Sequence, residues 1–132
     1  MPIVQFDERD FLRGKIVQPA WYDVRIDEVG EKTSSDGGSI NYPTEGTILR
    51  NSDDGTEDFA GVPIVWNFNS KARGFMLGFL ASMGIEPKPG QRVEMGGTVG
   101  HVVSMYIENK TYEGRILNAV NHKYRPVRTE QV

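Results

Sequence analysis

Hydrophobic and polar residues alternate along several short stretches of the chain, and a period of two predicts β-strands. The clearest stretch spans residues 21–29, where Tyr22, Val24 and Ile26 alternate with charged side chains. Two further stretches follow at 39–49 and 62–68, after the turn-forming sequences Asp-Gly-Gly and Asp-Asp-Gly. Glycine after aspartate favours tight reversals. The first half of the chain therefore predicts three consecutive strands.

A helical period occurs once, between residues 71 and 83. Apolar residues recur there at alternating steps of three and four, at Ala72, Phe75, Met76, Phe79, Leu80 and Met83. Gly74 and Gly78 each disfavour the helix by about 1 kcal/mol relative to alanine. We therefore expect the helix to depend on packing of its apolar face, as a plug against the β-domain.

The last third of the chain predicts two more strands, at 102–108 and 115–120, joined by a turn at 109–114. The turn carries an aromatic ring and cations. A short strand near 91–95 is a weaker expectation.

The order is three strands, one helix and two strands. This order, with bends at Pro43 and Gly46 in the second strand, is that of the OB-fold. The predicted fold class is therefore all-β with one helix, an OB-fold-like five-stranded barrel. Other small β-barrels with one helix satisfy the same order.

At 132 residues the chain fits one domain. We place that domain at 19–126, after an N-terminal arm at 1–18 and before a short basic tail at 127–132. No apolar run approaches the ~20 residues of a membrane helix, and the N-terminus lacks a secretory signal pattern. With no cysteine, disulfides are excluded. An intracellular location is the expectation.

The net charge is −3 and the sequence pI is near 5.4, which argues against a duplex-DNA binder that works through bulk positive charge. The charges are segregated, however. Residues 45–58 hold five acids and one base, whereas residues 110–128 hold five bases and one acid. Such runs are either solvated faces or a binding footprint.

Catalytic and metal-binding patterns are weak. The two histidines, His101 and His122, have no carboxylate partners at a recognisable metal-ligand spacing. The acidic stretch 53–58 lacks the ligand spacing of an EF-hand loop, and the glycine-rich stretch 96–100 lacks the Gly-Lys-Ser/Thr of a phosphate loop. We therefore predict no catalytic residue, no metal and no cofactor. A small metal-dependent enzyme is the least favoured class.

Five short pieces of sequence, taken in order, resemble a family of phage proteins long catalogued as a domain of unknown function and related to OB-fold single-stranded-DNA-binding proteins. They are Pro-Ala-Trp-Tyr-Asp-Val at 19–24, the stretch 31–38, Asn-Phe-Asn at 67–69, Tyr-Glu-Gly-Arg at 112–115 and the stretch 118–124. The resemblance implies an OB-fold and binding of single-stranded DNA in phage replication or recombination, in the host cytoplasm. It supplies no catalytic residue.

Partner recruitment is one point where the chain departs from such proteins. Many of them end in an acidic tail that recruits replication proteins, whereas this chain ends in the net basic sequence Arg-Pro-Val-Arg-Thr-Glu-Gln-Val. Replication or recombination partners, a homo-oligomer, and RNA in place of DNA remain open.

On an OB barrel the nucleic acid crosses the second and third strands, between the loops that join strands one to two and four to five. The candidate residues combine rings for base stacking with cations for phosphates: Arg25, Lys32, Tyr42, Trp66, Tyr106, Lys110, Tyr112, Arg115 and Lys123.

Each candidate has an alternative role. Tyr42 and Trp66 share the parity of apolar neighbours, which favours the core, while Tyr106 and Tyr112 are expected to be exposed. Lys110 and Arg115 can instead pair with neighbouring glutamates. Trp21 and Phe68 fit either the core or the surface. The alternative function is a protein-interaction or virion-associated β-barrel without nucleic-acid binding.

Overall fold

The computed structural model describes residues 2–35 and 37–127, and its strands follow the alternation of the sequence. β1 (Ala20–Val29) buries Tyr22, Val24 and Ile26 to 2% exposure or less. β3 (Ile40–Asn51), β4 (Pro63–Asn69) and the first half of β5 (Val102–Tyr112) bury their own alternate residues against the same core. The three predicted strands of the first half and the fourth predicted strand are confirmed.

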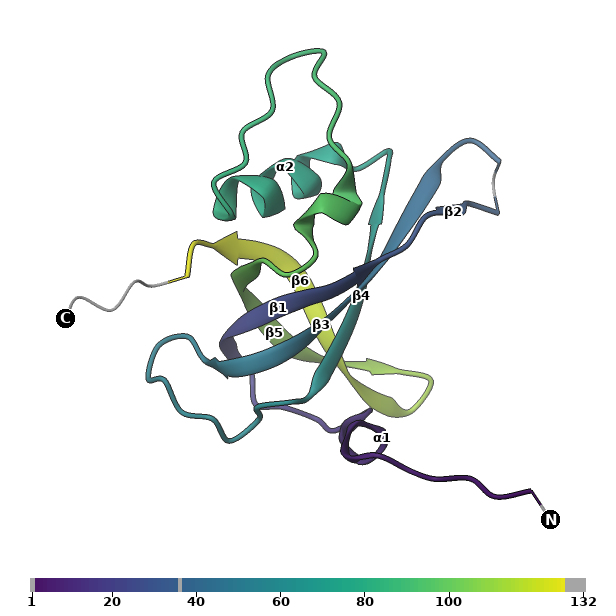
Figure 1. Cartoon of the computed structure of the whole chain (residues 1–132), viewed down its shortest axis with the longest axis vertical. Helices are drawn as coiled ribbons and strands as arrows, with labels where there is room; N and C mark the ends of the chain where they lie inside the picture. Colours follow the sequence, from purple (N-terminus) through teal and green to yellow (C-terminus); the bar gives the residue numbers. More distant parts are fainter. Residues whose placement is uncertain (1, 36, 128–132) are drawn as a thin grey trace.

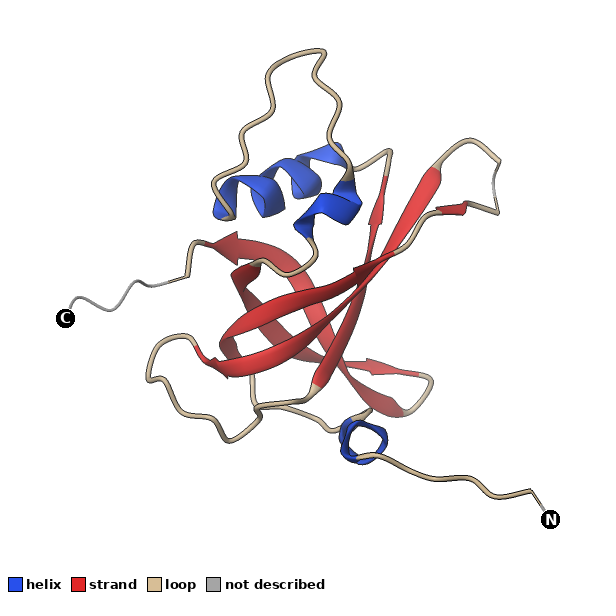
Figure 2. Ribbon diagram, in the orientation of Figure 1, coloured by secondary structure: helices blue, strands red, loops and turns tan. Residues whose placement is uncertain are grey.

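All strand pairs are antiparallel and belong to one six-stranded sheet, completed by β2 (Lys32–Thr33) and β6 (Arg115–Arg125). The strand order is β2-β3-β1-β5-β6, and β4 pairs with β3 outside this path. Figures 1 and 2 show a strongly twisted sheet that curves round the core. Among the ladders of the described residues none joins β4 to β6, so the sheet is open.

The last two strands are longer than predicted. The predicted turn at 109–114 shrinks to Glu113 and Gly114, whose φ angles of +48° and +75° match a two-residue type I′ turn. Strand pairing therefore reaches the Tyr112–Arg115 pair beside the turn.

The other end of β6 runs five residues past the predicted end at residue 120. The ladder shifts between Met105 and Ile107, and His122 adopts a φ of +53° at the corresponding place in β6. A bulge of this kind accommodates extra residues without ending the strand. As a result, Lys123 and Arg125 belong to the sheet.

The predicted strand at 91–95 is wrong. Residues 91–94 lie in a loop, and η1 (Met95–Thr98) is a single 3-10 turn. The buried Thr98 hydroxyl donates to the Met95 carbonyl oxygen at 2.7 Å. Gly96 and Gly97 offer no side chain to pack on a pleated surface, which favours the turn over a strand.

α2 (Arg73–Ser82) is the predicted helix, and it covers one end of the curved sheet (Figure 1). Phe79 and Leu80 are buried in the core. The Phe79 ring lies 4.9 Å from the Phe68 ring and 5.2 Å from the Tyr124 ring, centroid to centroid. Packing of an aromatic cluster thus offsets the low helix propensity of the two glycines, as expected.

The predicted N-terminal arm is anchored on the sheet. It contains α1 (Glu8–Leu12) and then Val17, which is only 1% exposed. The Asn118 side chain holds this segment: its Nδ2 donates to the Lys15 carbonyl at 2.8 Å, and its Oδ1 accepts from the Val17 N–H at 3.0 Å. Ahead of α1, the arm extends away from the sheet (Figure 1).

Two other expectations concern the ends of the chain and the membrane. Of the predicted basic tail at 127–132, only Val127 falls within the described residues. In the part of the chain that the structure describes, every helix is too short or too polar to cross a bilayer.

His122 joins α2 to the sheet and makes stability depend on pH. Its ring stacks on Phe75 at 4.4 Å, and its Nδ1 lies 3.0 Å from the Tyr124 hydroxyl. Burial disfavours the imidazolium and so lowers the pKa of His122 below its ordinary value of 6.5. The unfolded chain therefore takes up a proton at a higher pH than the folded chain.

The difference between the folded and unfolded pKa of His122 contributes to the free energy of unfolding. We expect this contribution to be fully present above about pH 6.5 and to be lost as the pH falls through the lowered pKa of the folded chain. Urea unfolding between pH 8 and pH 5 (about three pH units around the ordinary histidine pKa) checks this. His122→Asn should flatten the dependence, because asparagine tolerates a positive φ and does not titrate there. The matched control is His101→Asn, a substitution of the other histidine at an exposed position. Equal slopes for wild type and His122→Asn would contradict the prediction.

Candidate nucleic-acid interface

Two aromatic rings meet on the outer face of the sheet. The β1–β5 register pairs Trp21 with Tyr106, and opposite residues of an antiparallel pair project from the same face. Their ring centroids are 5.8 Å apart and the planes cross at 67°. The neighbouring residues Tyr22 and Met105 point the other way, into the core. Both rings are partly buried at the surface.

β6 adds a cation to each ring. The Arg125 guanidinium carbon lies 4.3 Å from the Trp21 ring centroid, and Lys123 Nζ lies 5.7 Å from the Tyr106 centroid. Both distances are in the range of cation–π contacts. Lys123 is exposed and Arg125 is partly buried. We call Trp21, Tyr106, Lys123 and Arg125 the ring–cation cluster.

The same outer face continues along the β5–β6 ribbon. Lys110 and Tyr112 follow Tyr106 at even spacing along β5, and the register pairs Tyr112 with Arg115. At about 3.4 Å per residue, Tyr112 lies about 20 Å along the strand from Tyr106. Tyr112 is 60% exposed, and Lys110 and Arg115 are exposed. Glu108 is the carboxylate on this stretch of the face.

The Arg125 side chain is fixed by hydrogen bonds as well as by the indole. Its Nη2 donates to Asp53 Oδ1 at 2.6 Å and to Ser52 Oγ at 3.3 Å, and its Nε donates to Ser104 Oγ at 3.4 Å. The buried Ser104 hydroxyl donates to Ser52 at 2.8 Å. The guanidinium is therefore held beside Trp21 by three hydrogen bonds rather than being free in solvent.

An ion pair between a buried carboxylate and a partly exposed arginine lies on the same face of the sheet. Asp23, at 4% exposure, accepts from Arg50 Nε at 3.0 Å. Asp23 is opposite Ser104 in the β1–β5 register. This pair adds no net charge to the ring–cation cluster.

Tyr42 and Trp66, predicted to stack on bases, face the core side of the sheet. Trp66 is only 8% exposed and packs edge-on against Phe68 and Phe79, at 6.4 and 6.3 Å between centroids. Phe68 is itself 1% exposed and therefore belongs to the core. Tyr42 is partly buried against the same core. Trp66 therefore offers no open face for a base.

Arg25 and Lys32 also lie apart from the ribbon. Arg25 is on β1, where its Nε contacts Asp27 Oδ1 at 2.9 Å. Lys32 belongs to the two-residue β2, at the opposite end of the strand order from β6. Of the nine predicted residues, the structure places five on the outer face of the β5–β6 ribbon: Tyr106, Lys110, Tyr112, Arg115 and Lys123.

The outer face of β3 and β4, where the second and third predicted strands run, has a different character. Arg13 Nη1 contacts Glu45 at 3.1 Å, and Arg9 donates to Thr47 at 3.0 Å and lies 3.5 Å from Asp27. Arg9 of α1 and Arg13, which follows the helix, thus pair with acidic residues on this face.

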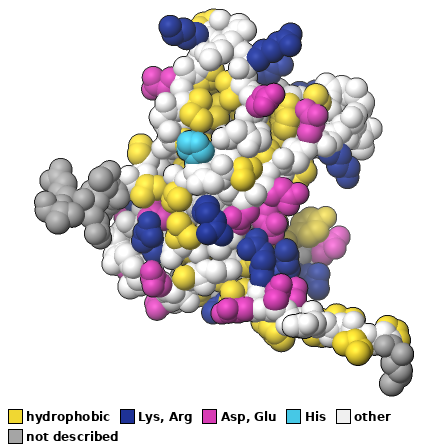
Figure 3. All heavy atoms as spheres, viewed as in Figure 1, with side chains coloured by type: hydrophobic (Ala, Val, Ile, Leu, Met, Phe, Trp, Pro, Cys, Tyr) yellow, Lys and Arg dark blue, Asp and Glu magenta, His cyan; other side chains and the backbone are white. Residues whose placement is uncertain are grey.

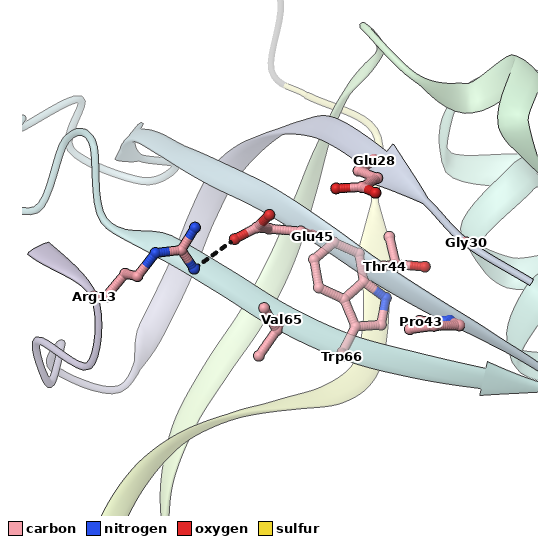
Figure 4. A pocket seen from close by; sticks show the side chains of 8 residues that line it. All are labelled: Arg13, Glu28, Gly30, Pro43, Thr44, Glu45, Val65 and Trp66. Atoms are coloured by element: carbon pink, nitrogen blue, oxygen red, sulfur yellow. Dashed lines mark hydrogen bonds and ion pairs between the residues drawn. The ribbon is translucent and has the colours of Figure 1, made fainter. Parts of the chain in front are cut away.

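A pocket of about 340 Å³ beside these contacts is lined by both charge signs and by the edge of the Trp66 indole (Figure 4). Its carboxylates come from Glu28 and Glu45, and its cation is Arg13, already paired with Glu45. Rings available for stacking are therefore on β1 and β5, not on β3 and β4.

Positive and negative side chains are distributed differently on the two faces of this protein. On the face seen in Figure 3, basic and acidic side chains are interspersed over the sheet. The ribbon face differs, because four cations, Lys110, Arg115, Lys123 and Arg125, share it with Glu108 and with Asp53 beside Arg125. A local cationic stripe of this kind is compatible with the net charge of −3.

Two members of the cluster were not among the predicted site residues. Trp21 was undecided, although its parity, opposite to that of Tyr22, is the signal that places it outside. Arg125 lay beyond the predicted last strand, and the positive φ of His122 that extends β6 has no signature in the sequence.

Comparison with known proteins adds no further information about this site. No protein-family model and no curated protein sequence matches the chain.

Proposed function

We propose that the protein binds single-stranded DNA on the outer face of β1, β5 and β6, with low sequence preference and without catalysing a reaction. The observation that carries the proposal is the ring–cation cluster, continued along the ribbon by Lys110, Tyr112 and Arg115. Rings with open faces stack on bases of any kind, and cations beside them neutralise the phosphates. Each stacked base contributes about 1–3 kcal/mol.

We also propose that the fold is an OB-fold. Support comes from the strand connectivity: β1, β3 and β4 form a meander, α2 follows, and β5 pairs with β1 and with β6. Closure between β4 and β6 would complete the five-stranded barrel, with β2 as a short extension. A role in phage DNA replication or recombination, in the host cytoplasm, rests on the resemblance of the five sequence pieces.

A fluorescence-anisotropy titration tests the function. Labelled oligothymidine, a duplex and an RNA of equal length are titrated at about 50 mM and about 200 mM salt. Oligothymidine should bind most tightly at low salt, because duplex bases are stacked away from the rings. RNA binding of equal strength would widen the substrate to single strands in general. Absence of binding at low salt, or equal binding of the duplex, would remove the proposal.

The salt dependence identifies the phosphate contacts. Lys110→Ala combined with Arg115→Ala should reduce the slope of log K against log salt by about 1.4, because each phosphate contact on a single strand contributes about 0.7. The matched control is Lys32→Ala combined with Lys88→Ala, which removes the same charge from exposed positions away from the ribbon. The control should shift affinity weakly and keep the slope. An unchanged slope in Lys110→Ala/Arg115→Ala together with a reduced slope in the control would instead place the phosphate contacts near Lys32 and Lys88.

A second candidate function has its own observation. Ile3, Phe6 and Phe11 of the N-terminal arm are 91%, 65% and 76% exposed. Exposed apolar side chains gathered on one segment are typical of protein contacts. A polypeptide partner that covers the arm would give a protein-interaction module, and loss of a co-purifying partner in Phe6→Ala/Phe11→Ala would support it.

A further inference from the structure

The carboxylate of Asp53 lies against the guanidinium of Arg125 in the ring–cation cluster. The distance from Arg125 Nη2 to Asp53 Oδ1 is 2.6 Å, and the two side chains are 29% and 51% exposed. Arginine binds carboxylates and phosphates through the same planar set of N–H donors. An oxygen of a nucleic-acid phosphate at this point would make the contact that Asp53 makes now.

The position of Asp53 is imposed by the chain around it. The Ser52 N–H donates to the Trp21 carbonyl at 2.8 Å, which ties the start of the loop to β1 beside the indole. Asn51 Oδ1 then accepts from the N–H groups of Asp53 and Asp54 at 2.8 and 3.1 Å. A side-chain turn of this kind fixes the local backbone. The carboxylate is therefore presented to Arg125 by a fixed loop.

We infer that Asp53 competes with nucleic-acid phosphate for Arg125 and so restrains binding at the ring–cation cluster. The inference rests on the proposed function. Arg125 covers Trp21 at 4.3 Å while Asp53, Ser52 and Ser104 hold it. A phosphate that takes Arg125 from Asp53 frees the guanidinium to follow the DNA backbone and opens that face of the indole to a base.

The ion pair between Arg125 and Asp53 is weak enough for a phosphate to replace the carboxylate. A partly exposed ion pair contributes about 0–1 kcal/mol, so a phosphate can replace the carboxylate at little cost. The wild-type protein gives up this contact on binding, whereas a variant without the carboxylate does not. The expected penalty on the wild-type affinity is therefore up to about fivefold.

The experiment compares Asp53→Asn with Glu57→Gln. Both substitutions remove one negative charge from the same exposed stretch, but Glu57 stands four residues further along the loop than Asp53, the residue that holds Arg125. Dissociation constants for oligothymidine are measured by anisotropy at low salt. Asp53→Asn should bind more tightly than the wild type, by up to about fivefold, and Glu57→Gln should gain clearly less. Quenching of tryptophan fluorescence by acrylamide, without DNA, should also increase in Asp53→Asn. The reason is that Arg125 no longer covers the Trp21 indole, while Trp66 stays buried.

The outcomes separate this inference from the proposed function. If the wild type binds but Asp53→Asn gains no more than Glu57→Gln, competition by Asp53 is rejected and the proposed function stands. Weaker binding by Asp53→Asn has the same consequence, because Asp53 would then position Arg125 for the DNA. If neither the wild type nor Asp53→Asn binds any oligonucleotide, the proposed function fails and the inference falls with it, whatever the quenching shows.

Discussion

Replacing Trp21 and Tyr106 together by alanine is expected to weaken oligothymidine binding at least about 30-fold. Two stacked rings at the lower limit of about 1 kcal/mol each contribute about 2 kcal/mol, which is a factor of about 30 in the dissociation constant. Lys123 and Arg125 also lose the rings that hold them in place. The loss therefore includes both stacking and the placement of two cations.

The matched control removes two rings from the rival surface. Phe6 and Phe11 are exposed on the N-terminal arm, with ring centroids 6.3 Å apart. Phe6→Ala/Phe11→Ala should leave the affinity for oligothymidine within experimental error. Anisotropy measures both affinities, and thermal unfolding confirms that each variant is folded.

A conservative variant separates stacking from other roles of the rings. Trp21→Phe with Tyr106→Phe keeps a π-face at each position and should retain most of the affinity, because base stacking tolerates any aromatic ring. Unchanged binding by the double alanine variant would place the DNA elsewhere on the protein.

The sequence was most informative where one alternation period ran through a whole strand. β1 and β4 match their predicted ranges to within one residue at each end. The apolar residues of one parity, such as Val24 and Ile26 in β1 and Ile64 and Phe68 in β4, are buried in the core, and this made the alternation visible in the sequence. The helix was recognisable for the same reason, through Phe79 and Leu80 on its buried face.

The candidate site was harder to predict, because it depends on pairing between distant strands. Tyr106 and Lys123 were expected at the surface, but their contact requires the register of β5 with β6. That register contains a bulge at His122, a histidine in a left-handed conformation that few non-glycine residues adopt. No local pattern indicates such a residue.

Trp66 illustrates a different ambiguity. An aromatic residue in a strand fits both a core and a stacking surface, and the parity shared with Ile64 and Phe68 pointed to the core. The assumption that the site lies on the second and third strands outweighed this parity. In the structure Trp66 and Phe68 of β4 turn inward, and Glu45 of β3 pairs with Arg9 and Arg13 on the outer face.

Gly46→Val is expected to cost about 3 kcal/mol of unfolding free energy, the upper end of the usual cost of overpacking, which is a large part of the stability of a small domain. Gly46 is buried on β3, and a Cβ there would lie 2.6 Å from Val24 Cγ1 and 2.8 Å from the Arg25 carbonyl oxygen. The carbonyl belongs to the paired strand, so β1 and β3 would have to separate. The backbone needs glycine here for space.

Two further substitutions are compared with Gly46→Val. Gly46→Ala adds only the Cβ and should already lower the urea midpoint clearly, since the close contacts are made by that atom. Gly78→Ala, in α2, has no neighbour within 4 Å of the new Cβ and should raise stability by up to about 1 kcal/mol through helix propensity. Urea unfolding followed by circular dichroism measures all three variants. A Gly46→Val protein as stable as the wild type would mean that β1 and β3 do not pack as closely as the Gly46 contacts require.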